Sequence, residues 1–235
     1  MAYEDFTTFT EVDPNGRISV DDASNITCTN LLRESVAAYV YKDYTATHFA
    51  TGLTHEFEIR CSSTGTYAAA GVWALSNDLS EMYEWASFSR EAAVAFLYGN
   101  FSLFLRDSEN GTGDQDNAGI SISTRYYCRV SWSSNTLTLY IYTDAARTSL
   151  HDSVTVTLAA GRTYRYCYAV VNNDDTKSTS SINFEVDNLD LKELTLADDS
   201  YENTSPYDNA ESIGTVAATG GVTPYSYAII DQRLV

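Results

Sequence analysis

A period-two alternation of apolar and polar residues is the feature that most limits how this chain can fold. It recurs in HEFEIRC (55–61), TLTLYIYT (136–143), SVTVTL (153–158) and INFEVDN (182–188). Successive side chains of a strand point to opposite faces, so each run predicts a strand with one buried face. Turn-rich pieces such as DPNG, SENGTGDQDN, AAGR and NNDDTKSTSS separate such runs. Eight or more short strands of this kind predict an all-β, two-sheet antiparallel sandwich.

One region departs from this pattern. Between positions 79 and 95 the residue propensities favour a helix. Residues 94–105 also fit two strands that turn around Gly99, and we favour the strand interpretation for them.

Charge narrows the choice of partners. The chain has 235 residues, 44% of them hydrophobic, with a net charge of -18. A surface this acidic repels polyanions, so nucleic acid and anionic lipid are excluded as expected partners.

No apolar run reaches the roughly 18 to 20 residues that a membrane-spanning helix needs. The opening, MAYEDFTTFTEVD, lacks the pattern of a secretory signal, which suits assembly in the cytoplasm or a mature chain whose leader was removed.

The four cysteines form no metal-binding pattern. They are separated by 33 to 67 residues, with no CxxC pair: Cys28, Cys61, Cys128 and Cys167. Their strand-like settings favour small buried hydrophobes over a disulfide, although at least one disulfide stays open as the alternative.

The composition changes near residue 196. Nine acidic residues and one lysine lie between Glu185 and Glu211. We therefore expect a β domain over 3–196, an acidic linker over 197–211, and a C-terminal arm or partial second β domain over 212–235. The arm has strand signals but too few residues for its own core. A free strand pairs readily with a neighbour, and the candidate partner-strand residues are Tyr225, Tyr227, Ile229 and Ile230.

A family resemblance supports the sandwich. The pieces DFTTFTEVDPNGRISV, AAYVYKDYTATHFATGLTHEFEIR and LYIYTDAARTSLHDSVTVTL with YAVVN behind it resemble concanavalin A-like (laminin-G-like) jelly-roll domains of phage-like and environmental sequences. The resemblance covers residues 3 to about 196. It implies a jelly roll whose first and last strands are neighbours, and it implies no defined activity. The tail, GTVAATGGVTPYSYAII, is similar to the beginning of an immunoglobulin- or cadherin-like repeat.

Tyrosine is unusually frequent, with 18 residues. Tyr140 and Tyr142 lie on one predicted strand, and Tyr166 and Tyr168 lie on another. If these two strands share a sheet, the four tyrosines form one aromatic face, because each pair alternates with other residues along its strand. Such a face is suited to subunit contacts or to sugar rings, and inner core is the third alternative. The candidate ligand or interface residues are Tyr140, Tyr142, Tyr166 and Tyr168.

An acidic, glycine-containing loop is the candidate metal site. In DSENGTGDQDN the oxygen ligands that calcium prefers come from Asp107, Asp114, Asp116 and Asn117. The spacing does not match an EF-hand, and a solvated turn is the alternative. Calcium is the only cofactor that the sequence suggests.

A carboxylate series, EVDNLD, partly matches the acid pair of glycoside hydrolases. It contains Glu185, Asp187 and Asp190. Ordinary alternation explains it better, because Phe184 and Val186 would point inward and place the first two acids on the outer face. We therefore expect no enzyme.

The function predicted from these features is a non-enzymatic structural subunit of an extracellular or virion assembly: a fibre, a filament or a surface decoration. Its arm would add a strand to a neighbouring copy or another subunit, and aromatic surface contacts would add buried area. The alternative is a carbohydrate-binding adhesin module that uses the tyrosines, with or without calcium.

The assembly hypothesis predicts the effect of a truncation. Deleting residues 197–235 should leave a folded monomer that no longer oligomerises, because the strand that pairs with a neighbour is removed. Light scattering on the full chain and the truncated chain measures this. An unchanged oligomer size would refute the role of the arm.

Overall fold

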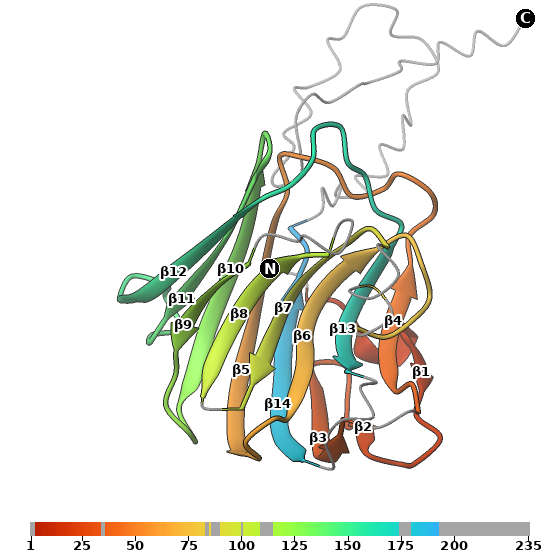
Figure 1. The fold of residues 1–235 in the computed structure, drawn as a ribbon, viewed down its shortest axis with the longest axis vertical. Helices are drawn as coiled ribbons and strands as arrows, with labels where there is room; N and C mark the ends of the chain where they lie inside the picture. Colours follow the sequence, from red (N-terminus) through yellow and green to blue (C-terminus); the bar gives the residue numbers. More distant parts are fainter. Residues whose placement is uncertain are drawn as a thin grey trace, which may run out of the picture. The chain divides into compact units, whose positions relative to one another are not determined.

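The computed structural model describes residues 3–33, 36–82, 85, 90–99, 101–108, 115–173 and 180–192. Over these residues the chain forms two seven-stranded antiparallel sheets, A and B. Figure 1 shows sheet A in front of sheet B. The predicted all-β sandwich is confirmed, and all its strands belong to a compact unit that ends at Leu191.

The order of strands in each sheet follows from the pairing of their backbones. Sheet A contains, from edge to edge, β1 (Thr10–Val12), β4 (Tyr39–Asp43), β13 (Tyr166–Asn172), β6 (Ala69–Ser76), β7 (Ala92–Tyr98), β8 (Ser102–Asp107) and β9 (Gln115–Gly119). Sheet B contains β12 (Leu150–Thr157), β11 (Thr136–Tyr142), β10 (Arg125–Ser133), β5 (Thr54–Thr64), β14 (Ser181–Asp190), β3 (Asn25–Leu32) and β2 (Ile18–Val20). A short 3-10 turn, η1 (Phe6–Thr8), precedes β1.

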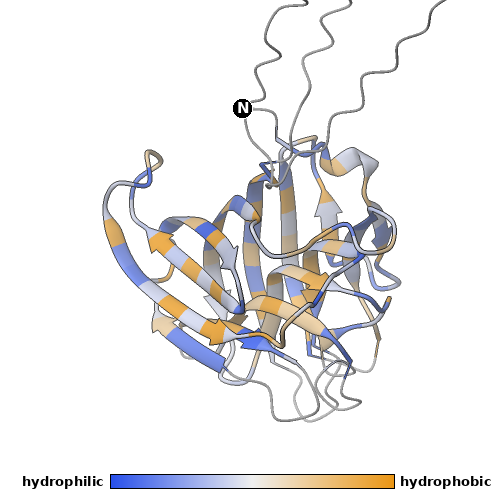
Figure 2. Cartoon of the chain, turned by 90° about the horizontal axis from the view of Figure 1, so that it is seen from above, coloured by the Kyte–Doolittle hydropathy of each residue, from blue (hydrophilic) through white to orange (hydrophobic). Residues whose placement is uncertain are grey.

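The core between the sheets consists of the apolar members of the alternating runs. The apolar residues of β5, β11, β12 and β14 that the alternation assigned to the buried face are all at most 3% exposed. Figure 2 shows the same alternation as orange and blue bands along the strands. Burial of this surface is the main stabilising contribution to the sandwich.

Sheet A is also covered on its outer face. Every residue of β6 and β13 is buried, so these strands have apolar contacts on both sides. A second apolar cluster lies on that outer face and includes Met82, Trp85 and Tyr168. Gly71 of β6 is required there, since a Cβ at this position would lie 2.4 Å from Cγ1 of Val171.

The helix favoured by propensity over 79–95 is wrong for its last residues. Met82 and Trp85 have helical backbone, but Ala92 begins strand β7, which pairs with β6 and β8. Pairing with a strand on each edge outweighs the helix propensity of the alanines, which is high in rank but worth less than about 1 kcal/mol per residue. The strand interpretation around Gly99 is confirmed, and a Cβ there would lie 2.1 Å from the carbonyl oxygen of Thr66.

No helix among the described residues is long and apolar enough to cross a membrane.

The expected pairing of the first and last strands is not found. The last strand, β14, pairs with β3 and β5 in sheet B, whereas β1 pairs with β4 in sheet A. The N-terminal segment still reaches the last strand, because the backbone N–H of Glu4 donates to the carbonyl oxygen of Leu189 at 2.7 Å. The first residues of the chain, before β1, therefore contact β14, and β1 itself does not pair with it.

All four cysteines are buried, and none of them is in a disulfide. Cys28, Cys128 and Cys167 are at most 1% exposed. Burial raises the pKa of the Cys61 thiol to about 11, so its reactive thiolate form is disfavoured. The interpretation of these residues as small buried hydrophobes is confirmed.

One buried histidine, His55, makes the stability of the core depend on pH. The indole Nε1 of Trp73 donates to Nδ1 of His55 at 3.1 Å, so the neutral His55 ring carries its proton on Nε2. His55 is 1% exposed, and burial lowers its pKa to about 3 from an ordinary 6.5. Charging the ring would remove the acceptor from Trp73 and place a cation among aromatic rings.

The stability of the protein should therefore decline in acid. Between pH 6.5 and about 3 the unfolded chain binds a proton at His55 that the folded chain does not. This group then lowers the free energy of unfolding by up to about 1.4 kcal/mol per pH unit as the pH falls. Urea unfolding of wild type and His55→Gln from pH 7 to pH 4 measures the contribution. The variant keeps an acceptor for Trp73 and should show the shallower slope; equal slopes would contradict the assignment.

Candidate functional site

Four tyrosines form a contiguous group on the outer face of sheet A. Tyr39 and Tyr41 belong to β4, and Tyr166 and Tyr168 belong to the adjacent β13. They share one face because the residues between them, Val40 among them, point into the core. The register sets Tyr168 opposite Tyr41, and ring centroids lie 5.6 to 5.9 Å apart. We call these four residues the tyrosine cluster.

Burial differs across the tyrosine cluster. Tyr168 is fully buried, its ring lies 5.1 Å from Trp85, and its hydroxyl donates to the carbonyl oxygen of Asp78 at 2.8 Å. Desolvation raises the pKa of Tyr168, so the hydroxyl stays protonated and fixed. Tyr39 and Tyr41 are half-buried. Tyr168 thus anchors the cluster, and β4 provides its accessible part.

A charged pair lies beside Tyr166, a buried member of the tyrosine cluster. Arg165 donates to both oxygens of Asp43, from Nε at 2.8 Å and from a terminal nitrogen at 2.6 Å. These side chains are 43% and 41% exposed. The hydrogen bonds from Arg165 lower the pKa of the Asp43 carboxyl to about 2. The guanidinium of Arg165 also lies 4.9 Å from the centre of the Tyr166 ring.

This arrangement has the parts of a small-molecule binding surface. Tyrosine rings offer flat apolar area with a polar hydroxyl at the edge. The Asp43–Arg165 pair holds planar acceptor and donor groups in a fixed geometry next to those rings. Aromatic area combined with a few oriented polar groups is typical of surfaces that bind ring-shaped polar ligands.

The expected aromatic face of four tyrosines does not form as predicted. Tyr140 and Tyr142 belong to β11 in sheet B, whereas Tyr166 and Tyr168 belong to β13 in sheet A. Figure 1 shows these strands in different sheets. Alternation fixes which face of a strand a residue occupies, but it cannot say which strands share a sheet. Tyr140 and Tyr142 stack on each other at 6.4 Å on the other side of the sandwich.

The sequence prediction missed Tyr39 and Tyr41. Their signal was present in AAYVYKDY, where the two tyrosines alternate around Val40. Nothing local marks that strand as the neighbour of β13, since more than 120 residues separate the two strands.

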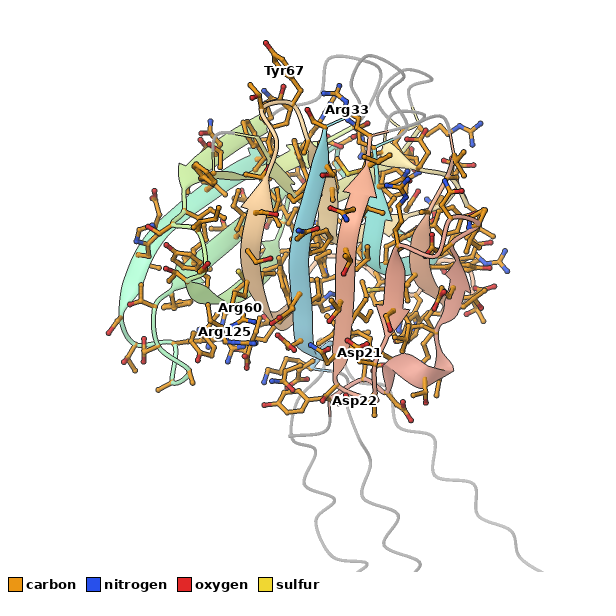
Figure 3. The ribbon with its side chains drawn as sticks, turned by 90° about the horizontal axis from the view of Figure 1, so that it is seen from below. Asp21, Asp22, Arg33, Arg60, Tyr67 and Arg125 are labelled. Carbon is orange, nitrogen blue, oxygen red and sulfur yellow. The ribbon has the colours of Figure 1, made fainter. Side chains whose placement is uncertain are left out.

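The carboxylate series of β14 takes part in an ion network. Glu185 and Asp187 lie on the outer face of sheet B, and Phe184 and Val186 are buried in the core as expected. Arg60 binds Glu185 at 2.6 Å. Arg125 contacts three carboxylates, those of Glu58, Glu185 and Asp187, and Figure 3 shows Arg60 and Arg125 side by side.

This network holds the two acids in place as ion-pair partners. Asp190, the third member of the series, is 5% exposed and lies beyond a register shift that follows Asp187. The three acids therefore do not form one regular row on the strand.

The candidate metal ligands occupy separate environments. Asp107, at the end of β8, is buried and accepts from Arg162 at 2.6 Å. Asp116 is exposed on β9, where its Oδ2 accepts from the backbone N–H of Thr155 at 3.2 Å. Asn117 is also exposed on β9, and Asp114 lies outside the described residues. Within the described part of the chain, no group of three His, Cys, Asp or Glu residues is arranged to hold a metal.

The predicted partner strand cannot be placed. Tyr225, Tyr227, Ile229 and Ile230 lie outside the described residues, as does the linker over 197–211. The role of this arm stays a prediction.

No family model matches the sequence, and no curated protein sequence matches it significantly. Solved structures do resemble the fold. A protein of unknown function from Saccharomyces cerevisiae has a TM-score of 0.51 at 14% identity, covering 79% of this chain and 96% of that chain. The exoplasmic/lumenal domain of VIP36, solved with Ca²⁺ and Man3GlcNAc, has a TM-score of 0.50 at 9% identity, covering 78% and 86%. Similarity at these identities shows the fold alone, a two-sheet antiparallel β-sandwich.

The pairing of Asp107 predicts a structural role. Asp107→Asn would leave the buried Arg162 cation without its carboxylate, which should lower the free energy of unfolding by about 3–5 kcal/mol. The exposed Asp116→Asn should change it by less than about 0.5 kcal/mol. Urea unfolding measures both. Wild-type stability in Asp107→Asn, together with loss of a calcium-induced thermal shift, would show that Asp107 is a metal ligand instead.

Proposed function

We propose that this protein is a carbohydrate-binding β-sandwich module that binds neutral sugars at the exposed end of the tyrosine cluster. The observation that carries the proposal is the position of the Asp43–Arg165 pair beside Tyr166, whose ring contacts that of Tyr41. The half-buried Tyr41 offers its ring to a ligand, and Asp43 and Arg165 offer hydrogen-bonding groups at its edge.

The chemistry of a sugar ring fits this combination. Its axial C–H groups form an apolar face that packs on an aromatic ring, and its hydroxyls need both donors and acceptors. Asp43 supplies acceptors and Arg165 supplies donors within one fixed pair. The net charge of -18 disfavours sulfated or polyuronic chains, so the ligand expected is a neutral glycan.

The fold similarity supports this proposal over a purely structural subunit. VIP36 was solved with a mannose-containing ligand and calcium, so a sandwich of this type can present a glycan site. That domain is described as exoplasmic/lumenal, and we propose an extracellular location for this chain. Calcium dependence stays a prediction because one of its candidate ligands, Asp114, lies outside the described residues.

Substitutions on the two sheets distinguish the candidate faces. Tyr41→Ala and Arg165→Ala should each weaken binding of the isolated protein to a neutral glycan by at least about tenfold, the effect of losing one good contact of about 1.4 kcal/mol. Tyr140→Ala, a matched change on the half-buried outer face of sheet B, should leave the affinity unchanged. A glycan array identifies the ligand, and calorimetry with and without EDTA gives the affinity and its calcium dependence.

The outcomes separate the alternatives. If Tyr140→Ala abolishes binding and Tyr41→Ala does not, the site lies on sheet B. Absence of binding to every neutral glycan would refute the proposal and return the assembly hypothesis to first place.

A further inference from the structure

Three turns meet at one end of the sandwich. They join β5 to β6, β7 to β8, and β9 to β10, and their described residues are 65–68, 99, 101 and 120–124. The N–H of Gly99 donates to the carbonyl oxygen of Ala68 at 2.8 Å, and the N–H of Ile120 donates to that of Phe101 at 2.7 Å. The three turns therefore form one continuous surface, which we call the loop rim.

The loop rim exposes large apolar side chains. Tyr67 is 58% exposed, Phe101 is 41% exposed and Ile122 is 42% exposed, one from each turn. Phe101 also has a φ of 58°, a left-handed conformation that is unfavourable for a bulky side chain. The turn between β7 and β8 accounts for the positive φ, but a bulky aromatic residue is an unfavourable choice there, and its exposed side chain points to a function of the surface.

Charge distinguishes the loop rim from the opposite end. Its described residues include no Asp or Glu, and its polar members are Ser, Thr and Gly. The neighbouring Arg33 donates to the carbonyl oxygen of Tyr67 at 3.0 Å. Figure 3 shows Tyr67 and Arg33 at one end of the sandwich and Asp21 and Asp22 at the other. On a chain with a net charge of -18, the described residues of the loop rim thus add no negative charge of their own.

The size of the surface limits what it can bind. Partial exposure of three such side chains amounts to on the order of 300 Å². A stable interface with a second copy buries roughly 800 Å² on each partner, so the rim is too small for a dimer. Projecting tips suit the interfacial layer of a bilayer, where a tyrosine hydroxyl meets the headgroups and Phe and Ile side chains reach the acyl boundary.

We propose that the loop rim inserts Tyr67, Phe101 and Ile122 into the interface of a lipid bilayer with zwitterionic headgroups. The net negative charge of the protein excludes attraction to anionic lipid as the driving force. Binding depends on apolar burial, so it varies little with salt. The surface is separate from the tyrosine cluster, and the inference does not depend on glycan binding.

Vesicle flotation with the full chain and phosphatidylcholine tests the proposal. The wild-type protein should partition onto vesicles, and the triple variant Tyr67→Ser, Phe101→Asn, Ile122→Ser should partition at least about tenfold more weakly. Asparagine tolerates the left-handed conformation at position 101, so the variant should stay folded, which circular dichroism checks. The matched control, Leu79→Ser with Leu150→Ser, removes two apolar side chains that are 43% and 54% exposed elsewhere and should bind like wild type.

Several results would overturn this proposal. They are a wild-type protein that does not float with phosphatidylcholine, a folded triple variant that floats equally well, or an equal loss in the Leu79/Leu150 control. A change in the oligomer mass of the triple variant without lipid would identify the loop rim as a protein interface instead. Vesicle binding by Tyr41→Ala at the wild-type level would support the separation of the two surfaces.

Discussion

Burial of apolar side chains between sheets A and B is the interaction on which every other feature depends. No helix packs against the sandwich as a layer of its own among the described residues, and the core residues come from strands that lie far apart in sequence. Each strand can bury one face only if the opposite sheet covers it. The core therefore fixes which side chains face outward, and the tyrosine cluster, the ion network and the loop rim all follow from that division.

The outer faces of the two sheets carry different kinds of side chain. Sheet A covers its central strands with Met82 and Trp85, which leaves the tyrosine cluster at the margin of an apolar layer. Sheet B instead surrounds Arg125 with carboxylates. These half-buried ion pairs give that face a fixed polar surface. The tyrosine cluster therefore adjoins an apolar layer, whereas Tyr140 and Tyr142 share the outer face of sheet B with ion pairs.

Charged groups inside the fold have a structural role. Asp107, which the sequence offered as a metal ligand, forms a buried ion pair with Arg162. His55 is held neutral by burial and accepts from Trp73. Both show that a residue type typical of functional sites serves the core when the tertiary structure supplies a partner for it. The most exposed polar pair near aromatic rings, Asp43 with Arg165, is the better candidate for recognition.

Local residue pattern was enough to locate these strands and to assign their buried faces. Alternation assigned Phe57, Leu139 and Phe184 to the core, and the turn at Gly99 followed from the apolar runs on either side of it. It could not assign strands to sheets, because pairing joins segments more than a hundred residues apart and local pattern carries no record of the partner. Tertiary packing placed Tyr140 on one sheet and Tyr166 on the other, brought Tyr41 to the side of Tyr166, and paired Asp107 with Arg162. The physical reason is that strand periodicity is set by neighbouring backbone geometry, whereas the identity of a neighbour is decided by the packing of the whole core.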